Sequence, residues 1–268
     1  MNFKPRHCGQ LGFSLIEMMI ALTVGTFLVL GVSQIYIDNK RSFLFQQGQT
    51  GNRNNAQLTL QVLDRQLART GFRADIRYQG TLQSAFPAVG AVADNDGVSC
   101  PAFDAGVTFA ATTDNVDAPT GVCIRYQGAL DNKDLDCLGN AIARVNLNTG
   151  GNVLLKLRYT AGATPGAGTL NCTVWSERAG ALTRKGSAVL VQGLQDFRWS
   201  IPLKTDVQKA SSAAVRYAAL LSTTEALTND VASNAAANWK ILTGRQIDDA
   251  SRPMQMLQST VMLRNLAL

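Results

Sequence analysis

One long apolar segment dominates the start of this chain. Residues 13–37 read FSLIEMMIALTVGTFLVLGVSQIYI, which is 25 residues with a single charged side chain, Glu17. As an α-helix the segment would be about 38 Å long. That is enough to cross a hydrocarbon layer of about 30 Å with some tilt. The segment therefore predicts a transmembrane helix near the N-terminus, ahead of the rest of the 268-residue chain.

A short basic leader precedes the apolar run. Residues 1–12 contain Lys4 and Arg6, and because positive residues favour the cytoplasmic side of a membrane, they direct the bulk of the chain outward. A secretory signal peptide begins in a similar way, but its apolar core spans about 7–15 residues and ends at a small-residue cleavage site. The run at 13–37 is longer and no such site follows it. On hydropathy alone, a plain signal anchor is a further alternative.

Glu17 is the exception within the apolar run. A carboxylate at the centre of a membrane helix costs on the order of 2.5–3.5 kcal/mol on insertion scales, and less near the interface, so it normally has a partner. The simplest interpretation is a protonated or interfacial side chain. The surrounding sequence is more specific. Residues 12–17 read GFSLIE, which resembles the class III signal of type IV prepilins, a basic leader ending in Gly and followed by Phe at the first mature position and Glu at the fifth.

The resemblance to type IV prepilins implies a processing route. Prepilin peptidase would cut between Gly12 and Phe13, remove the leader 1–12, and methylate the new amine of Phe13. The resemblance also supplies a partner for Glu17, namely the Phe13 ammonium of a neighbouring subunit during assembly. Two charges that are each unfavourable in lipid would then neutralise one another when subunits stack in register.

A helical pattern continues beyond the apolar run. Apolar residues recur at spacings of four, three and four, which places them on one helix face; they are Ala56, Leu60, Leu63 and Leu67. We expect one helix from Phe13 to about Arg69, with an apolar half at 13–37 for lipid or filament core and an amphipathic half at 38–70 for packing on a head. Since Gly48 and Gly51 weaken this helix, two helices joined by a loop at 48–55 is an equally good alternative.

Residues 71–268 have the pattern of a β-rich periplasmic or extracellular head domain. Apolar and β-branched runs are separated by Gly, Asn and Asp clusters. The runs are 107–112, 122–127, 141–146, 153–160, 170–176, 188–202, 215–221 and 259–266. The segment 148–152 fits a hairpin loop, and the Ala-rich stretch 223–239 fits a helix or a loop. The sequence predicts an α+β fold of the type IV pilin-like class, in which a long N-terminal helix packs on an antiparallel β-sheet with long loops.

Several head segments resemble the PilW family of minor pilins. They follow the family's order along nearly the whole chain: LDRQLARTGF at 63–72, IRYQG at 124–128, DCLG at 136–139, LVQGLQDF at 190–197 and VMLRN at 261–265. Each match is weak evidence alone. Together with the prepilin signal, the matches make the chain similar to the PilW family. One departure concerns the strand expected after the Ala-rich stretch, because 239–246 lacks an apolar run.

Four cysteines remain once Cys8 is removed with the leader, and they are Cys100, Cys123, Cys137 and Cys172. An even number in an exported domain favours two disulfides, with three connectivities open. A zinc or redox site fits poorly, because there is no C-x-x-C. The PilW resemblance places Cys137 and Cys172 in family-like segments, which favours the pairs Cys137–Cys172 and Cys100–Cys123. Each is worth about 3–4 kcal/mol in the chain-entropy model.

The residue inventory argues against catalysis. The single histidine, His7, lies in the leader, so the processed chain would lack an imidazole for Ser-His-Asp or Cys-His catalysis or for a zinc site. We therefore expect no enzyme, no cofactor and no metal. The formal charge of +6 falls when Lys4 and Arg6 leave. Because no basic run is interleaved with aromatics, we predict no direct nucleic-acid binding.

Two acidic segments invite a calcium interpretation, and neither fits it. In 131–136 the EF-hand pattern fails, because Lys133 occupies the third position, Asp136 replaces the glycine and Ile142 stands where the bidentate Glu should be. The segment 94–97 reads DNDG and is most simply a turn. Residues 171–173 form a glycosylation sequon, but if the chain is a bacterial pilin, as the resemblance implies, the sequon is not evidence of glycosylation.

The resemblance implies a minor pilin that primes type IV pilus assembly and supports pilus-dependent motility, adhesion or DNA uptake. Its implied partners are prepilin peptidase, the inner membrane, the major pilin, other minor pilins (PilV-, PilX-, PilE- and FimU-like) and a large tip adhesin. We expect a single-pass inner-membrane protein with a periplasmic head that later reaches the pilus tip at the cell surface. One alternative is a J-type pseudopilin at the tip of a type II secretion pseudopilus. Another, of a different class, is a membrane-anchored periplasmic binding protein or enzyme, which predicts a convergent polar cleft.

Overall fold

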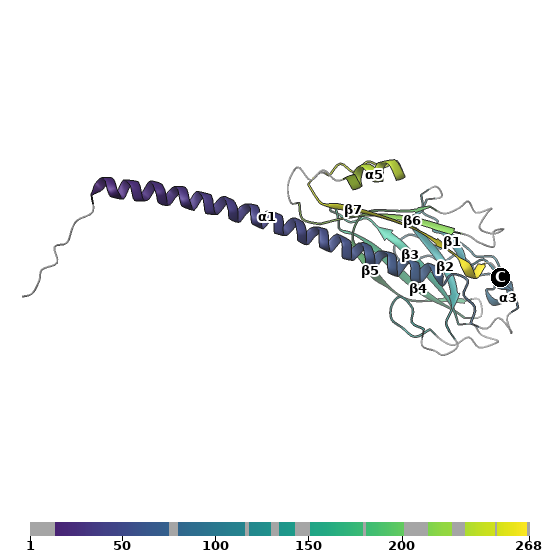
Figure 1. The fold of residues 1–268 in the computed structure, drawn as a ribbon. Coiled ribbons are helices and arrows are strands. Elements are labelled where there is room, and N and C mark those ends of the chain that lie inside the picture. The colour runs from purple at the N-terminus through teal and green to yellow at the C-terminus, as the bar shows by residue number, and fades with distance from the viewer. Residues whose placement is uncertain are drawn as a thin grey trace, which may run out of the picture. The chain divides into compact units, whose positions relative to one another are not determined.

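A computed structural model of the chain describes residues 14–74, 80–115, 118–129, 134–142, 151–178, 181–200, 214–226, 234–249 and 251–266. Figure 1 shows the elements in this part of the chain. They are α1 Leu15–Ala68, α3 Leu82–Ala85, β1 Phe109–Ala111, β2 Gly121–Gln127, β3 Asn152–Thr160, β4 Gly168–Arg178, β5 Ala181–Ser200, β6 Ala214–Ser222, α5 Asn234–Thr243, β7 Met254–Met262 and a short 3₁₀ helix Arg264–Leu266.

The helix α1 is continuous over 54 residues. The alternative of two helices with a loop at 48–55 is therefore wrong. The segment contains no proline, and glycine costs only about 1 kcal/mol in a helix interior. Directly after Gly51, the buried Asn52 donates a hydrogen bond to the Pro253 carbonyl at 2.8 Å. The helix crosses the boundary between two compact units, residues 1–47 and 48–268.

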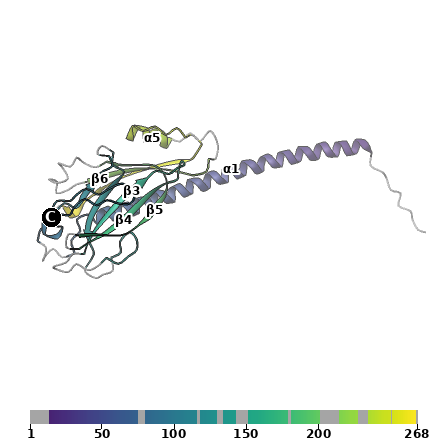
Figure 2. The same cartoon turned by 180° about the vertical axis from the view of Figure 1, so that it is seen from behind.

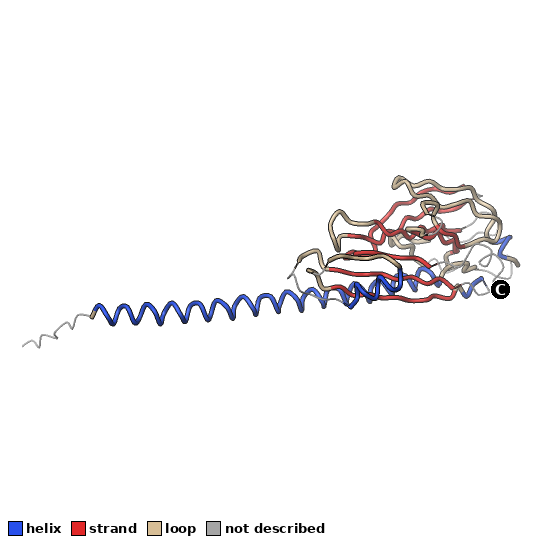
Figure 3. The backbone as a smooth tube through the Cα atoms, turned by 90° about the horizontal axis from the view of Figure 1, so that it is seen from above, coloured by secondary structure: helices blue, strands red, loops and turns tan. Residues whose placement is uncertain are grey.

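The head contains an antiparallel meander. Seven strands form one sheet in the order β1-β2-β3-β4-β5-β6-β7, and each pairs with the next along the chain. The strands lie side by side in Figure 3. The α+β prediction of a long apolar N-terminal helix packed on an antiparallel sheet is confirmed.

Side chains alternate between the two faces of this sheet, and each face has its own cover. The last part of α1 contributes Ala56, Leu63 and Leu67 to the main core, together with residues such as Ile124 and Leu155. Figure 1 shows α5 on the other side of the sheet, where Trp239 packs with Ala218 and Leu220.

A further core covers that same opposite face near the start of the meander. Val89, Cys100 and Phe103 pack there on Cys123 and Leu154, which alternate with the α1-facing residues of β2 and β3. The sheet is therefore the middle of three layers, as the rear view in Figure 2 also shows. The outer layers are the last part of α1, from residue 48 on, on one side and the segment 80–108 with α5 on the other.

Several predicted element limits need correction. The strand that the PilW family would have after the Ala-rich stretch is not formed at 239–246, in line with the departure noted in the sequence, because α5 occupies Asn234–Thr243. The last strand is Met254–Met262, earlier than the predicted 259–266, and β5 begins at Ala181, before the predicted start at 188. Of the predicted strand 141–146, the described part makes only an isolated bridge between Ala141 and Leu135. The predicted hairpin loop 148–152 lies mostly outside the described residues.

Candidate functional site: the N-terminal segment and its head

The described part of the N-terminal segment begins at Ser14, one residue before α1. The backbone amides of Glu17 and Met18 donate to the Ser14 carbonyl at 3.0 and 3.2 Å, so Ser14 lies at the N-cap and Glu17 is the third helical residue. This spacing is that of a capping box, and an acid in the first turn interacts favourably with the helix dipole. Gly12 and Phe13, the predicted cleavage and methylation residues, lie outside the described residues, as does the leader 1–12.

The first half of α1 has an apolar surface on every side. Leu15, Phe27 and Val32 are 78%, 79% and 66% exposed, and large apolar side chains between them are exposed to a similar extent. This is the one helix in the described chain that is long and apolar enough to cross a membrane, with a mean hydropathy of 2.2 over its best window, none of which is buried. A helix that is apolar all round requires a nonaqueous environment, such as lipid or the interior of an assembly.

Two threonine side chains within this half bond to the backbone of the helix itself. The hydroxyl of Thr23 donates to the Ile20 carbonyl at 2.9 Å, and that of Thr26 donates to the Leu22 carbonyl. Such bonds satisfy both threonine hydroxyls without water, as an apolar environment demands. Glu17 differs from them, since it carries the one formal charge in the run.

Buried ion pairs fix the segment 80–108 to the sheet. The fully buried Arg125 of β2 contacts Glu177 of β4 at 2.8 Å and donates to the Pro87 and Val107 carbonyls at 2.7 and 3.2 Å. Its guanidinium also lies over the ring of Phe86, at 5.4 Å from the centroid. A buried guanidinium requires such compensation, so this side chain locks the covering segment in place.

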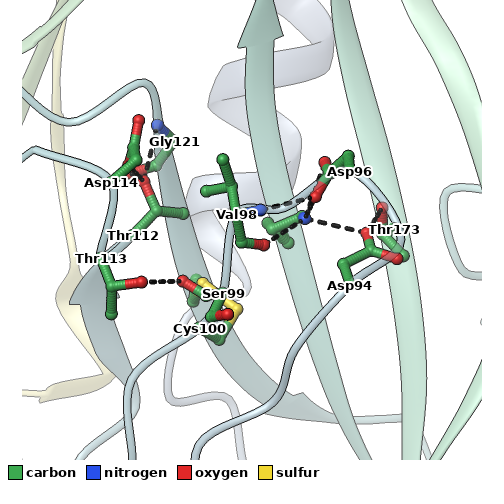
Figure 4. Close-up of a disulfide and its surroundings, with 12 residues drawn as sticks. Asp94, Asp96, Val98, Ser99, Cys100, Thr112, Thr113, Asp114, Gly121 and Thr173 are labelled. Carbon is green, nitrogen blue, oxygen red and sulfur yellow. Dashed lines mark hydrogen bonds and ion pairs between the residues drawn. A yellow bond between two sulfur atoms is a disulfide. The ribbon is translucent and has the colours of Figure 1, made fainter.

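A second buried cation holds the same segment. The Lys156 ammonium lies 2.8 Å from carboxylate oxygens of both Asp94 and Asp96 and donates to the Val98 carbonyl at 2.8 Å. Figure 4 shows these three residues around the ammonium, beside the disulfide of Cys100. Burial alone would raise the pKa of Asp94, but hydrogen bonds from Lys156, a backbone amide and Arg184 lower it to about 2.

The segment 94–97 therefore forms a turn and also supplies the counter-charges of a buried cation. The predicted turn is present, with the Gly97 amide donating to the Asp94 carbonyl at 3.1 Å, but its two acids also neutralise Lys156. Sequence reasoning missed this partnership. The available signal was a charged residue inside an apolar strand, VLLKLRY at 153–159. Arg125 in VCIRYQ at 122–127 gives the same signal.

The structure pairs the four head cysteines as Cys100–Cys123 and Cys137–Cys172, the pairs that the PilW resemblance favours. The first bond joins the segment 80–108 to β2, close to the ion pairs described above. The second joins the loop after β2 to β4. Of the candidate calcium segment, 131–133 lies outside the described residues, and Asp136 accepts hydrogen bonds from the Leu138 and Asn140 amides at 2.8 and 2.9 Å.

A cavity of about 550 Å³ lies beside the ends of β3 and β4. Its size suits a small molecule. It is therefore the place to look for the polar cleft that a periplasmic binding protein or enzyme would need. Its lining includes Asp136, Lys185 and Glu177, together with the apolar Ile142 and Val153. Glu177 is already paired with Arg125. Among the described residues no group of three or more His, Cys, Asp or Glu could hold a metal ion.

One known sequence profile agrees with the N-terminal pattern. Residues 8–33 match the sequence profile of the prokaryotic N-terminal methylation motif. No curated protein sequence matches the chain. Among solved structures the chain is similar to a type IV-like pilin from Thermus thermophilus, with a TM-score of 0.43, 13% sequence identity, and coverage of 81% of this chain and 98% of the other.

The methylation motif gives one explanation for the glycine before the apolar run, the acid within it and the exposed apolar helix. It contains Gly12, Phe13 and Glu17 together with most of the exposed apolar half of α1. A class III signal of this kind implies processing by prepilin peptidase. The match ends at residue 33, well before the head, so it describes the N-terminal segment alone.

Proposed function

We propose that this protein is a minor pilin, similar to PilW, that primes type IV pilus assembly. The observation that carries the proposal is the methylation motif at 8–33 on a helix whose first half exposes apolar side chains all round. A helix of that kind serves first as a membrane anchor. It then serves as a filament-core element once subunits leave the membrane.

In this proposal the N-terminus supplies the assembly chemistry. Prepilin peptidase cuts after Gly12, because its site must admit a residue without a side chain, and the amine of Phe13 is methylated. Glu17 is then four residues from a positive N-terminus and is exposed on the helix. The ammonium of an incoming subunit pairs with the carboxylate of its neighbour, and in low dielectric each charge without the other costs several kcal/mol.

The head supports a role at the end of the fibre. It is a seven-stranded sheet with covers on both faces, and its outer segment 80–108 is held by two buried ion-pair clusters and a disulfide. A head fixed in this way is suited to transmit load without unfolding. We infer that it joins PilV-, PilX-, PilE- and FimU-like minor pilins in the inner membrane and ends at the pilus tip, with a large adhesin.

The test is a charge deletion at Glu17 in the full chain. Glu17→Val makes the helix more apolar, and Glu17→Gln keeps the side-chain shape without the charge, so both variants should insert in the membrane. We expect both to lose most incorporation into surface pili, measured by immunoblot of sheared fibres. The matched control is Thr23→Val, which also removes a polar group from the exposed helix and should assemble normally.

The outcomes distinguish the candidate functions. Full piliation with Glu17→Val would show that the charge pair is unnecessary. Deletion of the protein should abolish surface pili and twitching while protein secretion continues. Lost secretion with intact pili would instead identify a J-type pseudopilin of a type II secretion system, which shares the same N-terminal chemistry.

A further inference from the structure

The final strand of the meander is a long sheet edge, and among the described residues its second half is uncovered. β7 pairs with β6 over nine consecutive residues without a register shift, and its other side has no strand partner among the described residues. Its sequence, MQMLQSTVM, contains no charged residue, no proline and no glycine. Proteins normally protect such edges with charges, prolines, bulges or short strands.

The other edges of the sheet carry that protection. β1 is only three residues long, and beyond it the edge of β2 is closed by Gly71 and Phe72, which bond to Arg125 and Gln127 at 2.9 and 3.0 Å. Since the other edges are protected and β7 is not, we take β7 to be a surface for binding another strand.

The first half of β5 is also protected, although it lacks a partner on one side. It pairs with β4 through three register shifts, and β6 joins it only from Leu194 onward. It also carries Arg184, Lys185 and Gly186. A bulged, charged strand with a glycine resists further pairing, so β7 is the one long regular edge in the described sheet.

The second half of β7 is accessible. Gln258, Thr260 and Met262 are exposed, whereas the first half lies under α5 through Met254 and Met256. In an antiparallel strand every second residue directs its N–H and C=O away from its partner. The outer side of β7 therefore presents a row of backbone donors and acceptors, which is the recognition surface used in β-strand addition.

Two exposed arginines lie beside the second half of this edge. Arg216, which is opposite Thr260 on β6, and Arg264, which follows the strand, are both exposed. Neither makes an ion pair among the described residues. A partner with a carboxylate at this end of its strand would complement them. Full antiparallel pairing of two copies would instead place Arg264 opposite Arg252 of the second copy. Asp249 is already paired with Arg252, so a second copy offers Arg264 no free carboxylate there.

We propose that β7 accepts an extended strand from the head of a different subunit of the assembly, with an uncharged centre and an Asp or Glu beside Arg216 and Arg264. This inference rests on the proposed function in one respect: the partner is taken to be another membrane-anchored subunit of the same assembly. The strand extends the seven-stranded sheet across the subunit boundary, and its acid fixes the register.

The test uses the full chain in piliated cells. A photoreactive benzoylphenylalanine replaces Met262 at the open edge, and the same group at Gln192, an exposed position on β5, is the control. Illumination should give one adduct from position 262 and none from 192. Mass spectrometry should map that adduct to an uncharged extended segment, ending in an acid, of another protein that carries an N-terminal methylation motif.

Charge variants then test the mode of contact. Gln258→Lys places a cation on the edge, and Arg264→Glu reverses the complementary charge; each should lower the adduct yield roughly tenfold. Gln192→Lys is the matched control and should leave the yield unchanged. Replacing the mapped partner acid by Lys should restore the yield with Arg264→Glu. Since these positions are exposed, the substitutions should change stability by less than about 0.5 kcal/mol.

An adduct with a second copy, with this chain's own segments or with lipid would overturn the proposal, as would no adduct. An adduct that is indifferent to Gln258→Lys would also overturn it, because the edge would not be the contact. These failures are separate from a failure of the proposed function, which is scored by the Glu17 variants and by piliation.

Discussion

Removing the charge of Asp94 should destabilise the head in a manner that depends on pH. The side chain of Asp94 is 2% exposed and lies 2.8 Å from the Lys156 ammonium and 2.9 Å from the Arg184 guanidinium. Its pKa falls from the ordinary 3.8 to about 2, which corresponds to about 2.5 kcal/mol of stability in favour of the ionised form.

The sign of this effect follows from linkage. Because folding lowers the pKa of Asp94, the stabilisation is complete above about pH 5 and is lost as the pH falls through 2. Asp94→Asn should therefore lower the free energy of unfolding by about 3 kcal/mol at pH 7. That value is at the low end for breaking a buried pair, since Asp96 still contacts Lys156. Near pH 2 the difference from wild type should shrink to below about 1 kcal/mol.

The assay is urea unfolding of the detergent-solubilised full chain, followed by the fluorescence of its three tryptophans, all of which lie in the head. Measurements at pH 7 and at successively lower pH give the two stability curves. The control is Asp104→Asn, an exposed acid whose substitution should change little at any pH. A difference between Asp94→Asn and wild type that stays constant from pH 7 to the lowest pH would refute the ion-pair account.

Two further changes test the attachments of the head. Replacing both Cys100 and Cys123 by Ser should lower the free energy of unfolding by roughly 3 kcal/mol, measured by the same urea curves; a negligible change would mean that the ion pairs alone hold the segment 80–108. Tyr217→Phe removes the hydrogen bond that its hydroxyl donates to Asp64 of α1 at 2.8 Å. It should cost about 1 kcal/mol, and an unchanged midpoint would show that this contact does not hold α1 on the sheet.

The features predictable from sequence are those with a local cause. The amphipathic half of α1 follows from the spacing of Ala56, Leu63 and Leu67, all of which are buried. Most strands follow from apolar runs between glycine and asparagine clusters. The continuity of α1 through Gly48 and Gly51 was undecided from sequence, because it depends in part on the distant contact between Asn52 and Pro253.

The features that sequence reasoning missed depend on partners far along the chain. α5 is fixed by the burial of Trp239, whose indole donates to Asp196 at 3.1 Å. The early start of β5 reflects its pairing with the long β4, since Thr183 and Arg184 carry no strand pattern of their own. The burial of Lys156 requires acids some sixty residues away in sequence. Periodicity alone carries no information on such pairs.

The central claim is that the N-terminal segment is a processed prepilin signal. The most direct measurement is the intact mass of the membrane-bound protein, with sequencing of its N-terminal peptide. We expect a chain that lacks residues 1–12 and begins at Phe13 with one added methyl group on its amine. A chain that retains Met1 to Gly12 would indicate a plain signal anchor, and cleavage beyond residue 37 would indicate an ordinary secretory signal. Either result would contradict the account.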